Sequence, residues 1–396
     1  MKKIKTALIS VFNKSGLDIL LEKLNKLEVT FISTGGTHDY ILSQGYEATT
    51  VESLTTYPSI LGGRVKTLHP KVMGGILARG DNDSDNQQLK EYDIIPIDLV
   101  IVDLYPFEDT LLATDNEGEI IEKIDIGGIT LIRAAAKNFK DVLVVPSAEL
   151  YGRFVELLES KDGITDINDR KYYAAKAFNV SSHYDSAIFN WMNAGEIDSF
   201  KLSIGNGIGL RYGENPHQKG FFYGNMNEVF EQIHGKAISY NNLLDLDAAI
   251  NLINDFDETT FAVIKHNNAC GLASRSNLTE AWNDALAGDP LSAFGGVLVT
   301  NRNIDMATAI EINKIFFEII IAPSYDDDAL EVLKAKKNRV ILVLKNSKFA
   351  NVQFRSLLNG VLVQDEQHFR FARDYCFPTP SEAACIVYGN SRNGWD

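Results

Sequence analysis

The chain has 396 residues, of which 45% are hydrophobic and 23% charged, and a formal net charge of -15. This length predicts two or three globular domains. The acidic charge argues against non-specific nucleic-acid binding, and no apolar run is long enough to span a bilayer, so we expect neither nucleic-acid nor membrane partners. Three cysteines make no disulfide framework, and the short apolar stretch after Met1 is no signal peptide, so we expect a cytoplasmic protein.

The first part of the chain, residues 1–146, alternates apolar runs with helix-like segments. Strands are expected over residues 6–12, 29–34, 98–107 and 141–146, and helices from about Ser15 and over residues 38–44. Continuous apolar runs are typical of buried parallel strands, and their alternation with helices is typical of a parallel sheet. The sequence therefore predicts an α/β domain here.

The next segments continue the α/β pattern into a second domain. Residues 147–193 are expected to form two helices, the first capped by Ser147, and a glycine-rich stretch after them places the domain boundary near 195–205. Strand-like runs return at residues 261–266, 295–300 and 339–344, so the second domain is expected to be α/β as well.

A basic, glycine-led stretch, GGRVKTLHPKV at residues 62–72, stands out in this acidic chain. Arg64 and Lys66 are separated by one residue, so in an extended loop they point the same way. Lysine and arginine bind phosphate or stabilise developing negative charge, and the Thr67 hydroxyl adds a neutral donor. A solvated surface loop is an equally good interpretation of this stretch alone.

Two polar turns follow predicted strands and lead into helices. One turn runs from Ser10 to Gly16, and the other runs over residues 33–37, Ser-Thr-Gly-Gly-Thr. Small residues at such turns expose backbone N–H groups at a helix N-terminus, which favours anions. Because ligands bind where the carboxyl ends of strands meet, both turns and the basic loop are expected to converge on one phosphate. A plain turn capped by Thr37 remains the alternative.

A third segment, KIDIGGITLIRAAAKN at residues 123–138, combines an acid with cations. Asp125 precedes two glycines, while Arg133 and Lys137 lie four apart on one helix face. An aspartate that faces lysines is ionised, and a lysine in a closed pocket can have its pKa lowered enough to exchange protons. The alternative for the two cations is a solvated helix face.

These segments resemble one enzyme family. ISVFNKSG, STGGT, GGRVKTLHPKVMGGILAR, DLYPF and IDIGGITLIRAAAKN match, in order, the IMP cyclohydrolase domain of the bifunctional purine-biosynthesis enzymes, AICAR transformylase/IMP cyclohydrolase. The resemblance covers residues 1–198 and implies a Rossmann-like fold of the methylglyoxal synthase type. It implies closure of 5-formamidoimidazole-4-carboxamide ribotide (FAICAR) to IMP without a cofactor. By motif match, Lys66, Tyr105, Asp125 and Lys137 surround the reacting groups, and Ser10, Lys14, Ser33, Thr34, Gly35, Arg64 and Thr67 bind the ribotide. Asp103 replaces the Asn of many members.

The second domain carries RYGENPHQKGFFYG, FAVIKHNNACG and DPLSAFGG. A lysine beside a histidine lowers the imidazole pKa, which suits a neutral general base, although a strand-end histidine is more often structural. These motifs and KAISYNNLLDLDAA resemble the AICAR transformylase domain, which is similar to the cytidine deaminase type and uses 10-formyltetrahydrofolate as co-substrate. The resemblance makes His266 the base, Lys265 its partner, Arg211 and Tyr212 phosphate ligands, and Phe294, Gly295 and Glu318 base contacts. The deaminase zinc signature is absent, so no metal is expected.

The resemblance covers residues 199–364 of this domain, and the tail at 365–396 is expected to diverge. We therefore expect a truncated chain with an incomplete deaminase-like domain, a competent cyclohydrolase, impaired formyl transfer, and a homodimer that the family forms but the missing half puts in doubt. A catalytically inactive, purine-ribotide-binding remnant is the alternative. A third candidate is a methylglyoxal synthase relative acting on triose phosphate.

Overall fold

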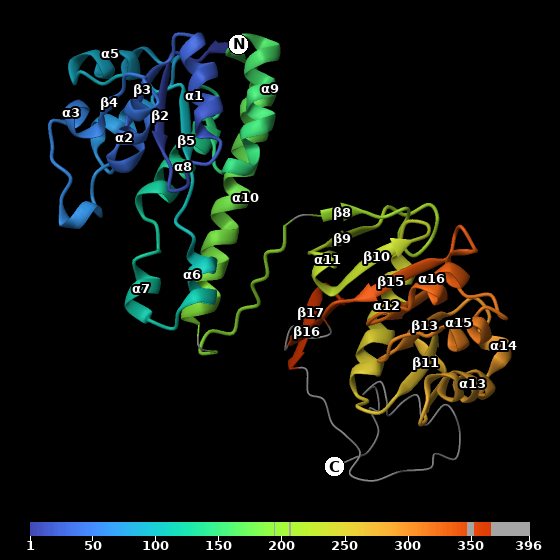
Figure 1. The fold of residues 1–396 in the computed structure, drawn as a ribbon. Helices are drawn as coiled ribbons and strands as arrows, with labels where there is room; N and C mark the ends of the chain where they lie inside the picture. The colour runs from blue at the N-terminus through green and yellow to red at the C-terminus, as the bar shows by residue number, and fades with distance from the viewer. Residues whose placement is uncertain (194, 206, 347–351, 366–396) are drawn as a thin grey trace. The chain divides into compact units, whose positions relative to one another are not determined.

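The structure is a computed structural model, and it describes residues 1–193, 195–205, 207–346 and 352–365. Its chain contacts divide it into two compact units, Met1–Ser203 and the part that begins at Ile204. Figure 1 shows the elements of each unit. The tail that was expected to diverge lies, from residue 366 on, outside the described residues.

The first unit is built on a parallel five-stranded sheet with strand order β4-β3-β2-β5-β6. Its strands are β2 (Thr6–Ser10), β3 (Thr30–Ser33), β4 (Thr49–Thr50), β5 (Leu99–Val102) and β6 (Leu143–Val145). All four residues of β5 are buried, as expected of a central parallel strand. The predicted α/β class is confirmed, but β5 ends at Val102 rather than before Pro106, because residues 103–106 leave the sheet.

Helices cover both faces of this sheet (Figure 1). Leu17, Leu20 and Phe154 from α1 and α9 pack on one face, and Val72 and Leu131 from α4 and α8 pack on the other. The apolar spacing of these helices produces the two layers. The helices are α1 (Leu17–Lys26), α2 (Gly35–Ser43), α3 (Val51–Thr55), α4 (Pro70–Leu77), α5 (Asp83–Glu91), α6 (Phe107–Ala113), α7 (Glu117–Ile121), α8 (Gly127–Lys137), α9 (Tyr151–Lys161) and α10 (Ile167–Met192), and β1 (Lys2–Lys3) pairs with β7 (Ile164–Thr165).

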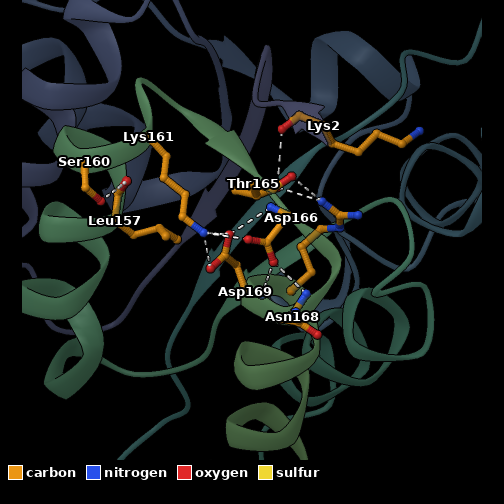
Figure 2. A network of polar contacts seen from close by, with 9 residues as sticks. Lys2, Leu157, Ser160, Lys161, Thr165, Asp166, Asn168 and Asp169 are labelled. Atoms are coloured by element: carbon orange, nitrogen blue, oxygen red, sulfur yellow. Dashed lines mark hydrogen bonds and ion pairs between the residues drawn. The ribbon is translucent and has the colours of Figure 1, made fainter.

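A polar network fixes the start of α10, the long second helix of the predicted pair (Figure 2). Asp166 and Asp169 form a capping box, and Lys161 Nζ lies 2.7 Å from Asp166 Oδ2 and 2.6 Å from Asp169 Oδ2. The buried Arg170 guanidinium donates to the carbonyl oxygens of Phe139, Lys140 and Thr165. A capped helix start of this kind gives α10 a defined position against the sheet. The predicted cap at Ser147 makes no side-chain hydrogen bond.

The second unit contains a mixed six-stranded sheet with strand order β10-β15-β14-β13-β11-β12. Strands β13, β14 and β15 are parallel, and β11 runs antiparallel to both of its neighbours. The three strands predicted in this domain are confirmed as β11, β13 and β15. The bounds are β10 (Phe230–His234), β11 (Thr260–Lys265), β12 (Asn268–Ser274), β13 (Val297–Thr300), β14 (Ile319–Ala322) and β15 (Val340–Leu344).

Alternate residues of these strands point into two different cores. Helix α12 covers one face, with Leu246 and Ile250 buried, while α13, α15 and α16 cover the other, where Trp282 is buried. The helices are α11 (Met226–Val229), α12 (Tyr240–Asn254), α13 (Leu278–Gly288), α14 (Pro290–Ala293), α15 (Met306–Ile312) and α16 (Asp327–Lys334). Two hairpins, β8 (Gly207–Gly209) with β9 (Phe221–Tyr223) and β16 (Val352–Leu357) with β17 (Gly360–Asp365), complete the described unit. No helix among the described residues is long and apolar enough to cross a membrane.

Candidate functional site

A cavity of about 750 Å³ opens at the carboxyl ends of β2, β3 and β5 in the first unit. This is the sheet edge where ligands of open α/β sheets bind. Most of the predicted residues line it, namely Ser10, Lys14, Thr34, Arg64, Lys66, Thr67, Tyr105 and Asp125. The convergence of the two polar turns and the basic loop, expected from sequence, is therefore present. Glycines 62, 63, 127 and 128 and residues 121–126 complete much of the wall.

Lys66 lies at the N-terminus of α2. A Cβ built on Gly35, the first residue of that helix, would lie 3.8 Å from Lys66 Nζ. The ammonium group and the unpaired N–H groups of the helix start therefore present positive charge to the same space. Gly62 and Gly63 have φ values of 67° and 93°, so this turn of the basic loop uses conformations that favour glycine. Arg64, on the rim, pairs with Glu122.

The hydroxyls of the Ser33–Thr37 turn have different uses. Thr34 is 4% exposed, and its Oγ1 has no hydrogen-bond partner among the described residues. Thr37 is not a helix cap, because its hydroxyl accepts from Val11 N at 3.1 Å and donates to Val11 O at 2.9 Å. The fully buried Ser33 hydroxyl donates to Ile9 O at 2.7 Å. Thr34 thus lines the cavity with a buried hydroxyl that has no partner among the described residues, whereas the Ser33 hydroxyl is used inside the sheet.

Asp125 lies in the irregular segment before α8. Its Oδ1 accepts from Gly128 N at 2.7 Å, and its own N–H donates to the Tyr184 hydroxyl at 2.9 Å. Burial raises the pKa of this carboxyl, the nearby Asp103 charge raises it further, and Lys66 opposes the rise. Burial and the Asp125 charge likewise raise the pKa of Tyr105. A carboxylate with a raised pKa is a better proton acceptor than one in water.

Asp103 holds the loop that follows β2. Its carboxylate accepts from Phe12 N and, at 2.9 Å, from Asn13 N. Lys14 turns back onto the same loop and donates to Val11 O and to Phe12 O. Burial lowers the pKa of Lys14, while Asp103 opposes this and Lys66 adds to it. The residue that departs from the resemblance therefore serves the local backbone.

Lys137 is not brought to the cavity. It is the last residue of α8, whose first residue, Gly127, lines the cavity. Ten residues of helix separate the two by about 15 Å at 1.5 Å per residue, and the Lys137 side chain is exposed. Lys137 is therefore not among the residues that line the cavity, and its contact with the reacting groups stays a prediction. The motif is continuous in sequence but runs along a helix axis away from the site.

Two contributors escaped the sequence analysis. Lys123 lines the cavity, and its Nζ lies 5.5 Å from the ring centroid of Phe12 and 5.8 Å from that of Tyr105. Tyr184, in α10, is the second, and its hydroxyl donates to the Lys123 carbonyl oxygen. A lysine two residues before Asp125 was a visible signal for the first, but only tertiary packing reveals the second.

Several predicted residues of the second unit gather at one edge of its sheet. Lys265 Nζ donates to Phe294 O at 2.8 Å, and Gly295 N donates to Phe316 O at 2.8 Å. The Phe294 ring is 60% exposed and contacts Phe316 with ring centroids 5.2 Å apart. The end of β11 and the starts of β13 and β14 meet here, because β11 pairs antiparallel to β13 and β13 parallel to β14.

His266 occupies a tight turn between β11 and β12 rather than a strand end. Lys265 pairs with Asn268, and the two residues between them, His266 and Asn267, have φ values of 53° and 60°. Positive φ at both central positions is the geometry of a type I′ hairpin. Asn267 N donates to Asp245 Oδ1 at 2.8 Å, which anchors the turn to α12. The imidazole is exposed.

Glu318 is held just before β14, and Arg211 and Tyr212 lie in a separate loop. Glu318 Oε2 lies 3.1 Å from Lys236 Nζ and accepts from Asn242 Nδ2 at 3.3 Å. The Arg211 guanidinium lies 5.2 Å from the Tyr212 ring centroid. Within the described residues, no hydrogen bond or ion pair joins Arg211 to the edge that carries His266. The structure therefore brings Lys265, His266, Phe294, Gly295 and Glu318 to one edge but does not place the predicted phosphate ligands there.

Comparison with known proteins decides the family. The model of the AICARFT/IMPCHase bienzyme matches residues 135–383, and the model of the MGS-like domain matches residues 16–130. The chain belongs to the AICARFT/IMPCHase bienzyme family. The predicted family is thus confirmed, as is the order of an MGS-like domain followed by the bienzyme domain. The bienzyme match extends to residue 383, past the Gln364 at which divergence was expected.

Two relatives in this family are similar to this chain over more than nine-tenths of its length. The bifunctional purine biosynthesis protein PurH of Bacteroides thetaiotaomicron is 59% identical over 396 residues, which cover 98% of this chain and 78% of that protein. PurH of Caldicellulosiruptor bescii is 43% identical over 386 residues, covering 93% of this chain and 75% of that protein. The crystal structure of ForH is 34% identical, covers 47% of this chain and 97% of that one, and has a TM-score of 0.42. The family to which this chain belongs is therefore a family of purine-biosynthesis enzymes.

Proposed function

We propose that the first unit closes FAICAR to IMP in the cavity at the ends of β2, β3 and β5. The observation that carries this proposal is the convergence of Lys66, Tyr105 and Asp125 in a cavity that also holds the N-terminus of α2. Cyclisation needs a held substrate, a proton acceptor and a stabiliser of negative charge. The cavity offers a group suited to each task.

The ribotide phosphate is placed at the start of α2. The buried Thr34 hydroxyl without a partner among the described residues, the N–H groups of the helix start and nearby Lys66 suit an anion there. Ser10, Lys14, Arg64 and Thr67 border the rest of the ribotide. The base then extends toward Asp125 and Tyr105, on the side of the cavity where α8 begins.

The chemistry joins the carboxamide nitrogen of FAICAR to its formyl carbon. As this C–N bond forms, the formyl oxygen becomes an oxyanion, which Lys66 stabilises, and the nitrogen gives a proton to Asp125. The oxyanion is then protonated, and the resulting hydroxyl leaves as water together with the proton of an adjacent ring nitrogen, so that a C=N bond forms and the ring becomes aromatic. The raised pKa of Asp125 suits a group that accepts and returns a proton.

For the second unit, we propose the family's formyl transfer from 10-formyltetrahydrofolate to the amine of AICAR. His266 serves as the base, with Lys265 beside it, and the exposed Phe294 ring, Gly295 and Glu318 contact the purine precursor. Arg211 and Tyr212 remain proposed phosphate ligands. The proposed assignments are residues 1–198 to the cyclohydrolase domain and 199–364 to the N-terminal part of the transformylase domain, in a cytoplasmic protein.

Ligand binding tests the substrate class. Titration calorimetry is expected to show IMP binding to the full chain with no detectable binding of dihydroxyacetone phosphate. The reverse preference would favour a methylglyoxal synthase relative. Binding of IMP without any turnover of FAICAR would favour the inactive, ribotide-binding alternative. Mixing AICAR with 10-formyltetrahydrofolate tests formyl transfer separately.

A further inference from the structure

The hydroxyl of Tyr184 contacts the segment that carries Asp125 at two points. It accepts from Asp125 N at 2.9 Å and donates to the carbonyl oxygen of Lys123. Tyr184 itself lies in α10, is 7% exposed, and does not line the cavity. A single hydroxyl therefore fixes both ends of the short stretch 123–125 from behind the cavity wall.

The Tyr184 ring, which carries this hydroxyl, is held in place by packing. The Tyr184 ring belongs to a small apolar cluster with Phe107 and Ile120, and the Tyr184 and Phe107 ring centroids are 6.0 Å apart. Phe107 also contacts Trp191, seven residues further along α10, with ring centroids 5.8 Å apart. A ring held on two sides in a capped helix gives its hydroxyl little freedom, which is what a supporting group needs.

The backbone of the segment has other restraints before residue 125, since Lys123 N donates to Ile120 O at 2.9 Å and Ile124 N to Ile121 O at 3.0 Å. Residues 124 and 125 lie in neither helix nor strand, between α7 and α8. The Asp125 carboxylate is held by Gly128 N at 2.7 Å, which sets the side chain but leaves the backbone at residue 125 to Tyr184. The position of the carboxylate in the cavity therefore depends on a hydroxyl that touches no substrate.

We propose that Tyr184 is a positioning residue for the cyclisation reaction, acting through the backbone of Asp125. This inference rests on the proposed function of the cavity. A displacement of about 1 Å at a reacting group can lower a rate by roughly 100-fold. Loss of the hydroxyl should therefore reduce turnover while leaving the phosphate end of the cavity, at the start of α2, unchanged.

Two matched variants test this. Tyr184→Phe removes only the anchoring hydroxyl, and Tyr173→Phe removes a hydroxyl from the same helix that has no hydrogen-bond partner among the described residues. In Tyr184→Phe, kcat for IMP formation should fall about tenfold or more, with IMP affinity unchanged. Hydrogen exchange of the amides at residues 123–128 should also become faster. Tyr173→Phe should behave as the unaltered chain in all three measurements.

The outcomes separate this inference from the proposed function. An unchanged kcat in Tyr184→Phe, or a parallel loss of kcat and IMP affinity, would overturn the positioning role. If the unaltered chain forms no IMP, the proposed function fails and the catalytic part of the inference fails with it. Hydrogen exchange then still tests whether Tyr184 holds the segment. An unchanged exchange rate of the Asp125 amide in Tyr184→Phe would show that it does not.

Discussion

Gly128 N donates to Asp125 Oδ1 at 2.7 Å, and a Cβ at Gly128 would lie 2.6 Å from Asp125 Oδ2. The glycine therefore lets the first turn of α8 approach the carboxylate closely enough to bind it. A side chain of any size would push the carboxylate from this position. This close approach gives Gly128, in the first turn of α8, a physical reason beyond turn formation.

Gly128→Ala is accordingly expected to lower the rate of IMP formation by roughly 100-fold, since it displaces a reacting group. Steady-state kinetics at saturating FAICAR would measure this. Gly152→Ala is the control, because a Cβ there meets nothing within 4 Å and the residue lies in α9. That control should keep full activity and gain about 0.5–1 kcal/mol of stability. Equal activities of the two variants would contradict the account.

Asp103→Asn should move the acidic limb of the pH profile to lower pH. The negative charge of Asp103 raises the pKa of Asp125, so its removal lowers that pKa. Asp125 then stays ionised, and able to accept a proton, at lower pH. The dependence of kcat/KM on pH reports this ionisation in the free enzyme. A limb that stays in place or moves to higher pH would show that Asp125 is not the group titrated.

Thr34 and Ser33 should respond oppositely to loss of their hydroxyls. Thr34→Val should weaken IMP binding by roughly tenfold without loss of stability, because the Thr34 hydroxyl has no partner among the described residues. Ser33→Ala should cost about 1 kcal/mol of stability and leave IMP affinity unchanged, because its hydroxyl bonds Ile9 O. Calorimetry and urea unfolding would measure both. Weaker IMP binding by Ser33→Ala would show that the Ser33 hydroxyl contributes to the ligand site.

Arg170 is expected to be important for the stability of the first unit. Its side chain is 3% exposed and donates to three carbonyl oxygens and to the Thr165 hydroxyl. Arg170→Met leaves those acceptors buried without donors and should cost about 2–4 kcal/mol in urea unfolding. Lys171→Met, at the exposed neighbouring position, should change stability little. A similar small change in both variants would mean that water replaces the lost donors.

Much of the fold and the cavity could be predicted from local sequence, since apolar runs marked the strands and polar turns marked their carboxyl ends. What the local sequence could not predict depends on distance through space. Lys137 shares a motif with Asp125 but lies at the far end of α8, and the Ser33 hydroxyl is used by a neighbouring strand. Tyr184 is a buried aromatic residue of α10, and only the packing of that helix reveals that its hydroxyl supports Asp125.

The most direct test of the central claim is IMP formation from FAICAR by the 396-residue chain without folate, followed by ultraviolet absorbance. Lys66→Met should abolish it, whereas Lys71→Met should not, because Lys71 pairs with Asp93 at 3.3 Å outside the cavity lining. That result would establish the cavity as a working cyclohydrolase site. No IMP from the folded chain, or equal rates in both variants, would contradict the assignment.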